Sequence, residues 1–328
     1  MLKTGNLTAA LACSPLHMVQ DIHPLAKTFP YAICGRSLVI HADCLEWLAK
    51  ADANSIHACV TDPPYGVKEY EADQVERLQN GNRGGIWRLP PVLNGIERSP
   101  LPRFTALSPQ ERAQLAEFFT IWSRAVQRVL RPGAHVFMAS NSFLSQEVFS
   151  AVVAGGLEFR GEVIRLVQTL RGGDRPKLHE KEFPGVCSLP RGSYEPWGIF
   201  RKPLPPKMRA GECLRKFGTG GIRRRKDGGQ FLDVIESERT PKIERAVADH
   251  PSLKPISFMR EIVYAALPLG EGVILDTFSG SGSTLAACEL EGLEGIGVEK
   301  NKGFFKGSLK SIPALVALRL GQQIQLPL

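Results

Sequence analysis

Residues 275–287 read LDTFSGSGSTLAA, and this stretch decides the fold class of the 328-residue chain. An apolar strand pattern ends at Asp276, two glycines follow, and a helical pattern begins at once. Gly280 and Gly282 permit a tight turn and let a ligand approach the backbone. Glu299 closes the next apolar run 19 residues after Gly280, about where an acid reaches a ribose in nucleotide-binding βαβ units. The stretch indicates a nucleoside site, with a structural turn beside a surface glutamate as the alternative.

The residues around the glycines allow three nucleoside ligands to be compared. A phosphate-binding P-loop requires lysine after its last glycine, whereas Gly282 is followed by Ser283 and Thr284. A dinucleotide fold usually has a third glycine at the position that Leu285 occupies. S-adenosylmethionine needs ribose recognition and carries no pyrophosphate, so this loop leaves room for it. Composition alone does not decide among these ligands.

Strand and helix patterns alternate along most of the chain. Strands are expected at residues 37–41, 56–61, 134–139, 157–168, 194–201 and 272–276, and one more ends near 299. Helices are expected at 42–48, from a capping box at 108–111 to about 130, at 143–155, at 256–267, and from the glycine loop to about 291. This alternation predicts an α/β fold with a mostly parallel, helix-covered sheet.

Composition is that of a globular protein. The chain is 43% hydrophobic and long enough to bury a core. No run approaches the ~20 continuous apolar residues that span a membrane, and the N-terminus lacks the pattern of a secretory signal, so we expect a cytoplasmic protein without a membrane partner. The seven cysteines are scattered and never spaced as Cys-x-x-Cys, so neither a disulfide framework nor a metal site is indicated.

Positive charge is concentrated in one segment. The formal net charge is +8, and ten Lys or Arg residues lie between Arg201 and Lys226 against one acid, Glu212. A local positive field of this kind suits a polyanion, because neutralising phosphates releases counterions. A solvated surface loop is the alternative interpretation.

The segment TDPPYGV, residues 61–67, follows the apolar run 56–60. Pro63 and Pro64 stiffen the chain, so the Asp62 carboxylate and the nearby carbonyls point in fixed directions. The exocyclic amine of a nucleobase is a poor nucleophile, because its lone pair is delocalised into the ring. Two fixed acceptors favour a tetrahedral nitrogen and stabilise the positive charge that develops there. Tyr65 offers a face on which a flipped base can stack. A strand followed by a proline turn is the structural alternative.

At this point the sequence resembles the DNA amino-methyltransferases that use S-adenosylmethionine. The matching segments are VIHADCLEWL, VTDPPYG, SYEPWGIFRK, HPSLKPI, ILDTFSGSGSTLAACE and GIGVEKN. The catalytic motif precedes the cofactor loop, as in the circularly permuted β group of these enzymes. The resemblance therefore implies a Rossmann-like methyltransferase fold with permuted motif order and an inserted recognition region. In an open parallel sheet both motifs lie at the carboxyl edge, whichever comes first in the chain.

The resemblance implies roles for individual residues. Asp62 and the Pro63 carbonyl would hold the target amine, Pro64 completes the motif, and Tyr65 would stack on the base. Residues 278–282 would pack the methionine end of the cofactor, Glu299 would bind its ribose, and Asp43 would lie near its adenine. Lys254 would line the methionine pocket, and Asp276 would orient the loop. The expected cofactor residues are Asp43, Lys254, Asp276, Phe278, Ser279, Gly280, Gly282, Ser283, Thr284 and Glu299.

Two departures from the family pattern concern the cofactor site. Where the family often has Asp-Pro-Phe-Ala before the glycines, this chain has residues 276–279 as Asp-Thr-Phe-Ser. Where an acid often follows the ribose-binding glutamate, this chain has Lys300 and Asn301. Both departures concern contacts to the cofactor and leave the catalytic tetrapeptide intact.

Asp-Pro-Pro-Tyr in this family indicates adenine N6 in double-stranded DNA as the target, with cytosine N4 as the alternative. Methylation at cytosine C5 is disfavoured, because it needs a nucleophilic cysteine, usually after proline, and no Pro-Cys dipeptide occurs. RNA, a protein glutamine, a non-catalytic DNA-binding regulator and an NAD-linked oxidoreductase remain rival interpretations. DNA contacts are expected from Arg83, Arg88, Arg103, Arg215, Lys216, Arg223, Arg224, Arg225 and Lys226.

The resemblance also divides the chain. Residues 1–37 form an N-terminal extension with no assigned role, and 38–170 form the catalytic half, which includes a long loop at 66–107. Residues 171–250 form the target-recognition region, and 251–328 form the cofactor-binding half. The recognition sequence, a homodimer and a cognate restriction nuclease are left open.

Overall fold

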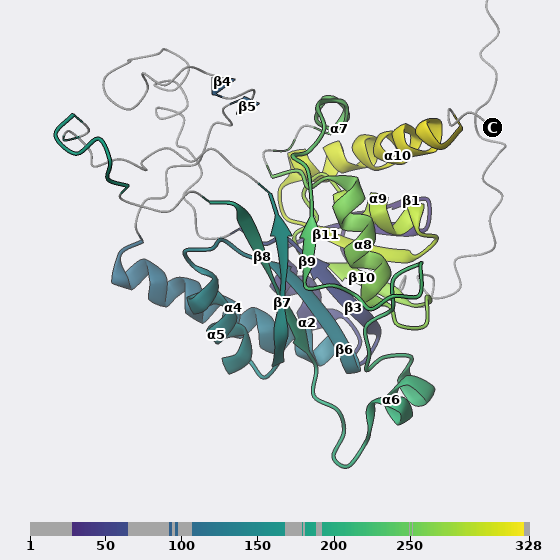
Figure 1. Cartoon of the computed structure of the whole chain (residues 1–328). Helices are drawn as coiled ribbons and strands as arrows, with labels where there is room; N and C mark the ends of the chain where they lie inside the picture. The colour runs from purple at the N-terminus through teal and green to yellow at the C-terminus, as the bar shows by residue number, and fades with distance from the viewer. Residues whose placement is uncertain are drawn as a thin grey trace, which may run out of the picture.

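The computed structural model describes residues 28–64, 92–93, 96–97, 107–167, 179, 181–187, 192–248, 250 and 252–324. Over this part of the chain, helices flank a central sheet on both sides (Figure 1). Tyr65, Arg83, Arg88 and Arg103 lie outside the described residues, as does most of the predicted extension.

The main sheet has the strand order β1-β2-β11-β10-β3-β6-β8-β7-β9. The bounds are β1 Tyr31–Cys34, β2 Ser37–His41, β3 Ile56–Thr61, β6 Leu130–Ala139, β7 Glu158–Leu166, β8 Tyr194–Arg201, β9 Val234–Glu236, β10 Val273–Asp276 and β11 Glu294–Glu299. β2, β11, β10, β3 and β6 are parallel neighbours, whereas β8 is antiparallel to β6 and β7. A separate ribbon pairs β4 (Val92–Leu93) with β5 (Ile96–Glu97). The predicted α/β class with a mostly parallel sheet is confirmed.

Helices bury the two faces of the sheet. α2 (Cys44–Lys50), α4 (Pro109–Val129) and α5 (Ser145–Ala154) pack their apolar side chains into one core. α8 (Ile256–Ala266), α9 (Ser283–Leu290) and α10 (Lys302–Ile324) cover the other face (Figure 1). Two short helices, α6 (Ala210–Phe217) and α7 (Lys242–Val247), lie in the connection between β8 and α8. No helix in the described ranges is long and apolar enough to cross a membrane.

α4 shows how local sequence fixes an element. The Ser108 hydroxyl accepts a hydrogen bond from Glu111 N, and the Glu111 carboxylate accepts one from Ser108 N. This reciprocal cap satisfies two backbone donors at the start of the helix. Phe119, Trp122 and Val126 recur at helical spacing and are fully buried. The same face brings the Trp122 indole toward the glycine loop, because its Nε1 donates to Thr277 Oγ1 at 3.1 Å.

The pairing of β3 with β10 brings the two motifs together, although their order in the chain is permuted. Ala58 lies opposite Ile274, and Cys59 lies opposite Leu275, in parallel register. Both strands therefore end at the same edge of the sheet, which is here called the carboxyl edge; the opposite edge is called the amino edge. Asp62 and the glycine loop start from neighbouring strands at the carboxyl edge, where open α/β sheets bind ligands.

The range 171–250, predicted to be the recognition region, is joined to the rest of the fold at several places in its described part. β8 and β9, both within this range, are strands of the main sheet. After β8 ends opposite His135, the chain continues at the amino edge, where the Cys213 thiol of α6 lies 3.1 Å from the Pro132 carbonyl oxygen. β9 then runs parallel to β7 toward the carboxyl edge, and the segment before α8 reaches Asp62 through Lys254.

Several elements differ from the sequence prediction. β1, which falls in the range expected to be an extension without a role, pairs with β2 and extends the sheet. α10 was not expected, and it packs Ile312 and Leu315 against the core beside α9. β6 also starts earlier than expected, at Leu130, so the Arg131-Pro132-Gly133 turn after α4 belongs to the strand.

Candidate active site

The two glycines of the loop after β10 serve different purposes. Both have left-handed backbone, with φ of 49° at Gly280 and 86° at Gly282. A Cβ on Gly282 would lie 2.4 Å from Ile312 Cγ1, so this glycine is required for packing against α10. A Cβ on Gly280 would lie 3.0 Å from His250 Nε2, on the side of the loop that lines a cavity. The loop therefore combines one structural glycine with one glycine at the site.

Asp276 ends β10 and holds the start of the loop. Its Oδ1 accepts hydrogen bonds from the Thr61 hydroxyl at 2.7 Å and from Phe278 N at 3.1 Å. Burial raises the pKa of Asp276 to about 6, although hydrogen bonds from Thr284, Thr61 and Phe278 N favour its charged form. Because Thr61 directly precedes Asp62, the bond between Thr61 and Asp276 connects the predicted catalytic segment to the predicted cofactor loop.

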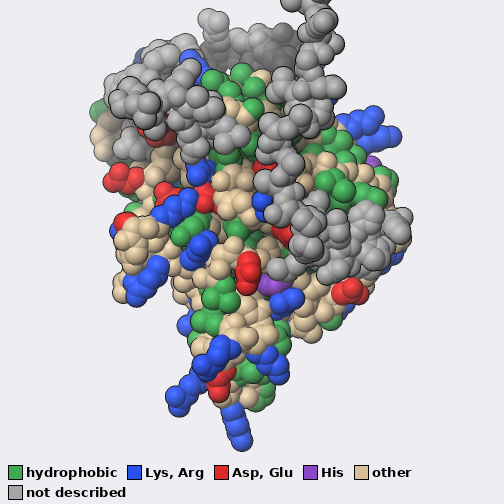
Figure 2. Space-filling model, turned by 90° about the vertical axis from the view of Figure 1, so that its right-hand side faces the viewer, with side chains coloured by type: hydrophobic (Ala, Val, Ile, Leu, Met, Phe, Trp, Pro, Cys, Tyr) green, Lys and Arg blue, Asp and Glu red, His purple; other side chains and the backbone are tan. Residues whose placement is uncertain are grey.

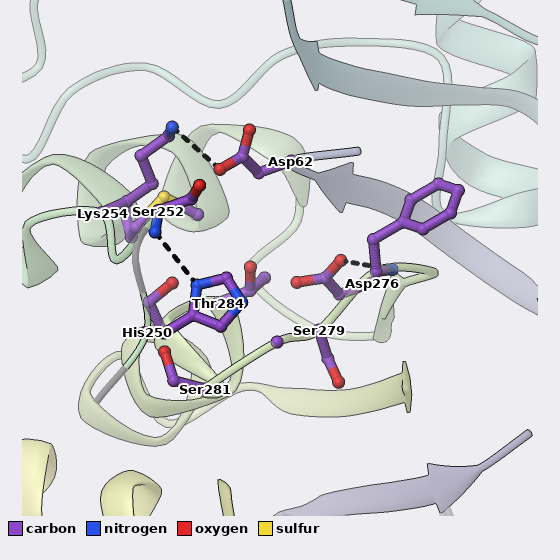
Figure 3. Close-up of a pocket in the computed structure, with 12 residues that line it drawn as sticks. Asp62, His250, Ser252, Lys254, Asp276, Ser279, Ser281 and Thr284 are labelled. Carbon is purple, nitrogen blue, oxygen red and sulfur yellow. Dashed lines mark hydrogen bonds and ion pairs between the residues drawn. The ribbon is translucent and has the colours of Figure 1, made fainter. Parts of the chain in front are cut away.

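Asp62 lies just past the end of β3 and faces the segment before α8. Pro63 is buried and Pro64 is exposed, so the two prolines lead the chain outward from the sheet. Asp62 Oδ2 is 2.8 Å from Lys254 Nζ, and the two side chains are 15% and 8% exposed (Figure 3). The carboxylate is thus fixed in direction at the carboxyl edge.

Lys254 bridges two carboxylates. Its Nζ is also 3.3 Å from Glu195 Oε1 on β8. Burial disfavours the ammonium charge, but Asp62 and Glu195 outweigh this effect and raise the pKa of Lys254 above its ordinary value. Burial likewise disfavours the Glu195 carboxylate, but Lys254 and Arg165 outweigh it and lower the pKa of Glu195. The charged forms of Lys254 and Glu195 are therefore both favoured at neutral pH.

A cavity brings most of the predicted residues together. It encloses about 310 Å³ of space, part of which is open to solvent. Figure 3 shows Asp62 and Lys254 at the top, His250 and Ser281 at the lower left, and Asp276 at the right. Eight of the residues expected from the sequence line it: Asp62, Lys254, Asp276, Phe278, Ser279, Gly280, Ser283 and Thr284. His250, Ser252, Met259 and Ser281 complete the lining.

The chemistry of this lining fits S-adenosylmethionine. The Ser279 hydroxyl is buried, and within the described residues it has no hydrogen-bond partner. Ser283 and Thr284 open α9, and backbone N–H groups at a helix start attract a carboxylate such as that of the methionine moiety. Gly280 is buried against the His250 ring, so it lines the cavity with backbone alone.

Asp43 and Glu299 do not line the cavity. Both carboxylates accept hydrogen bonds from nearby backbone N–H groups. Glu299 Oε2 accepts a hydrogen bond from Gly280 N at 2.9 Å, and its Oε1 accepts one from Asn301 N at 2.7 Å. The carboxylate thus connects the glycine loop to the end of β11.

Asp43 caps α2 and pairs with a residue that departs from the family pattern. Its Oδ1 accepts from Leu45 N at 2.9 Å, and its Oδ2 is 2.9 Å from Lys300 Nζ. Burial would raise the pKa of Asp43, but the hydrogen bonds from Lys300 and Leu45 N outweigh it and hold the pKa below its ordinary value. Asp43 therefore stays ionised at the end of the site where the adenine is expected.

Sequence reasoning missed four polar residues of the site. His250 and Ser252 belong to the HPSLKP segment, from which only Lys254 was assigned, and the ring of His250 lies against the loop at Gly280. Thr61 and Glu195 belong to quoted motifs and had no assigned role. The signal for His250 was present in the sequence, because it shares a motif with Lys254. No sequence signal placed Glu195 beside Lys254.

The predicted DNA-binding residues of the basic segment lie at the amino edge. α6, which carries Arg215 and Lys216, packs on the first residues of β6, level with the start of β3. Arg223 lies over the Tyr264 ring near the end of α8, and Lys226 is 2.6 Å from Glu291 after α9. Figure 1 places α6 at the foot of the molecule, where Figure 2 shows a group of Lys and Arg side chains. The structure thus places Arg215, Lys216, Arg223 and Lys226 away from Asp62.

Comparisons with known proteins give one consistent result. The model of a family described as DNA methylase matches residues 190–310. The Type II methyltransferase M.HindIII of Haemophilus influenzae is 25% identical over 289 residues, which cover 81% of this chain and 92% of the relative. The Type II methyltransferase M2.DpnII of Streptococcus pneumoniae is 23% identical over 288 residues, covering 88% and 93%.

Among solved structures, the cytosine-N4-specific PvuII DNA methyltransferase matches with a TM-score of 0.53 and 14% identity. The match covers 87% of this chain and 93% of the PvuII chain. At this identity the likeness shows a shared fold and does not indicate the target base.

Proposed function

We propose that this chain, which belongs to the S-adenosylmethionine-dependent DNA methyltransferases, transfers a methyl group to the exocyclic N6 amine of adenine in duplex DNA. One observation carries the mechanism: Asp62 and the glycine loop, which are far apart in sequence, line one cavity at the carboxyl edge. The choice of adenine is supported by the tetrapeptide Asp-Pro-Pro-Tyr at residues 62–65.

The proposed chemistry begins with the target amine. The Asp62 carboxylate and the Pro63 carbonyl accept its two N–H hydrogens, which favours a tetrahedral nitrogen with an available lone pair. As the new N–C bond forms and the bond between the methyl carbon and the cofactor sulfur breaks, the nitrogen becomes positive, and the negative Asp62 stabilises that charge. The nitrogen must then lose one proton, and Asp62 is the adjacent acceptor. Tyr65 is proposed to stack on the flipped base.

S-adenosylmethionine bound in the cavity supplies an electrophilic methyl group on a positively charged sulfur. We propose that Ser279, Ser283 and Thr284 bind its methionine moiety, and that Lys254 lines that part of the site. Phe278, Gly280 and Gly282 shape the loop around it, while Asp276 fixes the loop to β3 through Thr61. Glu299 is proposed for the ribose hydroxyls, and Asp43 for the adenine.

The test is transfer of a labelled methyl group from S-adenosylmethionine to mixed-sequence duplex DNA, followed by digestion and mass analysis of the nucleosides. Label in N6-methyladenine supports the proposal. Label in N4-methylcytosine keeps the mechanism and changes the base. Absence of label with bound cofactor directs the search to RNA, and then to a non-catalytic DNA-binding role.

Asp62→Ala is the matched variant for this assay. It should reduce transfer by at least about a thousandfold while cofactor affinity stays within a few fold, because Asp62 acts mainly in the transition state. Cofactor affinity is measured by calorimetry on both proteins. Undiminished transfer by Asp62→Ala would overturn the assignment of the catalytic acid.

The wider setting is also proposed. The relatives named above are Type II methyltransferases, which supports a restriction-modification context with a cognate nuclease. DNA as substrate is consistent with the cytoplasmic location expected from the sequence. A homodimer remains a prediction, and light scattering on the purified protein measures it directly.

A further inference from the structure

A row of alternating charges leads from Asp62 into the antiparallel part of the sheet. The Lys254 ammonium is 2.8 Å from Asp62 and 3.3 Å from Glu195. Glu195 Oε2 is in turn 3.2 Å from Arg165 Nη1. The four residues come from β3, the segment before α8, β8 and β7. The predicted catalytic acid is therefore connected to two residues for which neither the sequence nor the comparisons suggest a role.

Glu195 and Arg165 are held in place by further contacts. Trp197 Nε1 donates to Glu195 Oε1 at 2.8 Å. The Arg165 guanidinium donates to Ser237 Oγ and to the Glu238 carbonyl oxygen, each at 3.0 Å. These contacts orient both side chains, so Lys254 lies between two carboxylates of fixed direction.

Stability alone explains this arrangement poorly. The side chains of Lys254, Arg165 and Glu195 are 8%, 6% and 19% exposed. Removing charges from water is costly, and apolar residues of similar volume in place of a buried ion pair are often as stable. Four charged groups at this depth, with one of them the predicted catalytic acid, point to a role in the reaction.

Charge balance suggests that role. Lys254 and Arg165 carry two positive charges, and Asp62 and Glu195 carry two negative charges, so the cluster is neutral. Methyl transfer moves the positive charge of the cofactor sulfur onto the amine beside Asp62. Without the charge of Glu195, the cluster would have a net charge of +1 next to that amine, and it would oppose the transition state.

We propose that Glu195 is a positioning residue for methyl transfer, which holds the Lys254 ammonium beside Asp62 and balances its charge while the target amine becomes positive. This inference rests on the proposed function. Arg165 completes the balance, because it neutralises Glu195 and orients its carboxylate.

Glu195→Gln tests the proposal, with Glu158→Gln as the matched control. Glu158 pairs with Arg201 across the same two strands at the amino edge, away from Asp62. The single-turnover methylation rate should fall roughly tenfold to a hundredfold in Glu195→Gln and stay within about twofold in Glu158→Gln. Cofactor affinity of both variants should stay close to that of the wild type. Glu195→Gln should unfold at a lower temperature, because it leaves a buried positive charge unbalanced, so the rates are compared at a temperature at which every variant is folded.

A double variant separates charge from packing. Arg165→Gln combined with Glu195→Gln restores a neutral cluster, so it should be faster than Glu195→Gln alone by several fold. If Glu195 only holds the structure together, the second substitution should slow the enzyme further. Thermal unfolding of each variant identifies any loss of folding.

The pH profile gives an independent readout. Lys254 faces Asp62 on β3, Glu195 on β8 and Arg165 on β7, and Asp276 lines the same cavity. In Glu195→Gln the lysine loses one of its two carboxylates, so it should lose its proton at lower pH than in the wild type. The rate of this variant should therefore recover as the pH is raised, whereas that of Glu158→Gln should follow the wild type.

The outcomes distinguish this inference from the proposed function. If the wild type methylates DNA and Glu195→Gln matches it in rate and pH profile, the positioning role is wrong and the proposed function stands. If the wild type transfers no methyl group to DNA, the proposed function fails first. A slower Glu195→Gln enzyme that the double variant does not restore also overturns the charge-balance role.

Discussion

The two glycines of the loop make opposite demands on a substituted side chain. At Gly282 a Cβ meets Ile312 at 2.4 Å and Ile312 Cδ1 at 2.7 Å, in a backbone conformation that favours glycine. At Gly280 the near atoms belong to the His250 ring, which lines the cavity. Two glycines of one sequence motif therefore have different roles. Gly282 allows packing against α10, whereas Gly280 lines the cavity.

Gly282→Ala should lower the free energy of unfolding by about 2–4 kcal/mol, because it combines left-handed strain with overpacking against α10. Gly280→Ala should cost only about 1 kcal/mol of stability, and it should weaken cofactor binding because the His250 ring has to move. Urea unfolding and calorimetry on both variants measure these effects. A Gly280→Ala protein that binds the cofactor normally would show that His250 does not shape the site.

At the scale of elements, the connection between β8 and α8 has its basic residues at one edge of the sheet and its site residues at the other. Its first part, with α6, stays at the amino edge, and its last part delivers His250 and Lys254 to the carboxyl edge. DNA that presents a base to Asp62 approaches the carboxyl edge. A stiff duplex does not bend back from the carboxyl edge to the amino edge of one sheet, because its persistence length is about 150 base pairs. We therefore propose that the basic residues of α6 contact a different stretch of DNA.

Replacing Arg215 and Lys216 with alanine tests this placement. On a short duplex of roughly 12 base pairs, the methylation rate and the salt dependence should stay as in the wild type. On long DNA, the slope of log affinity against log salt should decrease by about 2, because two phosphate contacts are lost. A decreased slope on the short duplex would place α6 beside the target base and contradict the geometry.

At the scale of the whole molecule, two buried histidines make folding depend on pH. Burial lowers the pKa of His57 to about 4 and that of His135 to about 3, in both cases aided by nearby arginines. The unfolded chain binds protons on these rings below about pH 6.5, which the folded chain does not, so stability falls as the pH falls. Asp276, with its pKa raised to about 6, acts in the opposite direction and offsets part of the loss.

Between pH 7 and pH 5 the free energy of unfolding should fall by about 2–3 kcal/mol. His57→Asn should reduce this dependence, because asparagine does not titrate and its side-chain oxygen can accept the hydrogen bond from Val273 N that His57 Nδ1 now accepts. His179→Asn, at an exposed position, is the control. Denaturant unfolding at several pH values measures both. An unchanged pH dependence in His57→Asn would contradict the burial argument.

Sequence reasoning reached the two elements that form the site and missed the contacts between distant ones. Apolar runs ending at Asp62 and Asp276 indicate strands, and parallel strands end at one edge, so the cavity was predictable. The pairing of Glu195 with Lys254 depends on the position and direction of β8 in the sheet, which no local pattern contains. α10 was missed because Pro313 lies inside it and its apolar periodicity is weak. The position of the basic segment at the amino edge depends on the contact between Cys213 and Pro132, which are far apart in the sequence.

The pairing of β3 with β10 has a consequence for synthesis on the ribosome. Thr61 and Asp276 are 215 positions apart, and β1 and β2 join the rest of the sheet only through β11 and β10. A nascent chain that already displays Asp-Pro-Pro-Tyr therefore lacks two inner strands until the ribosome has passed residue 299. Contacts of such long range also form slowly. The enzyme thus acquires its site late, so truncated chains should carry the catalytic tetrapeptide without activity toward the genome.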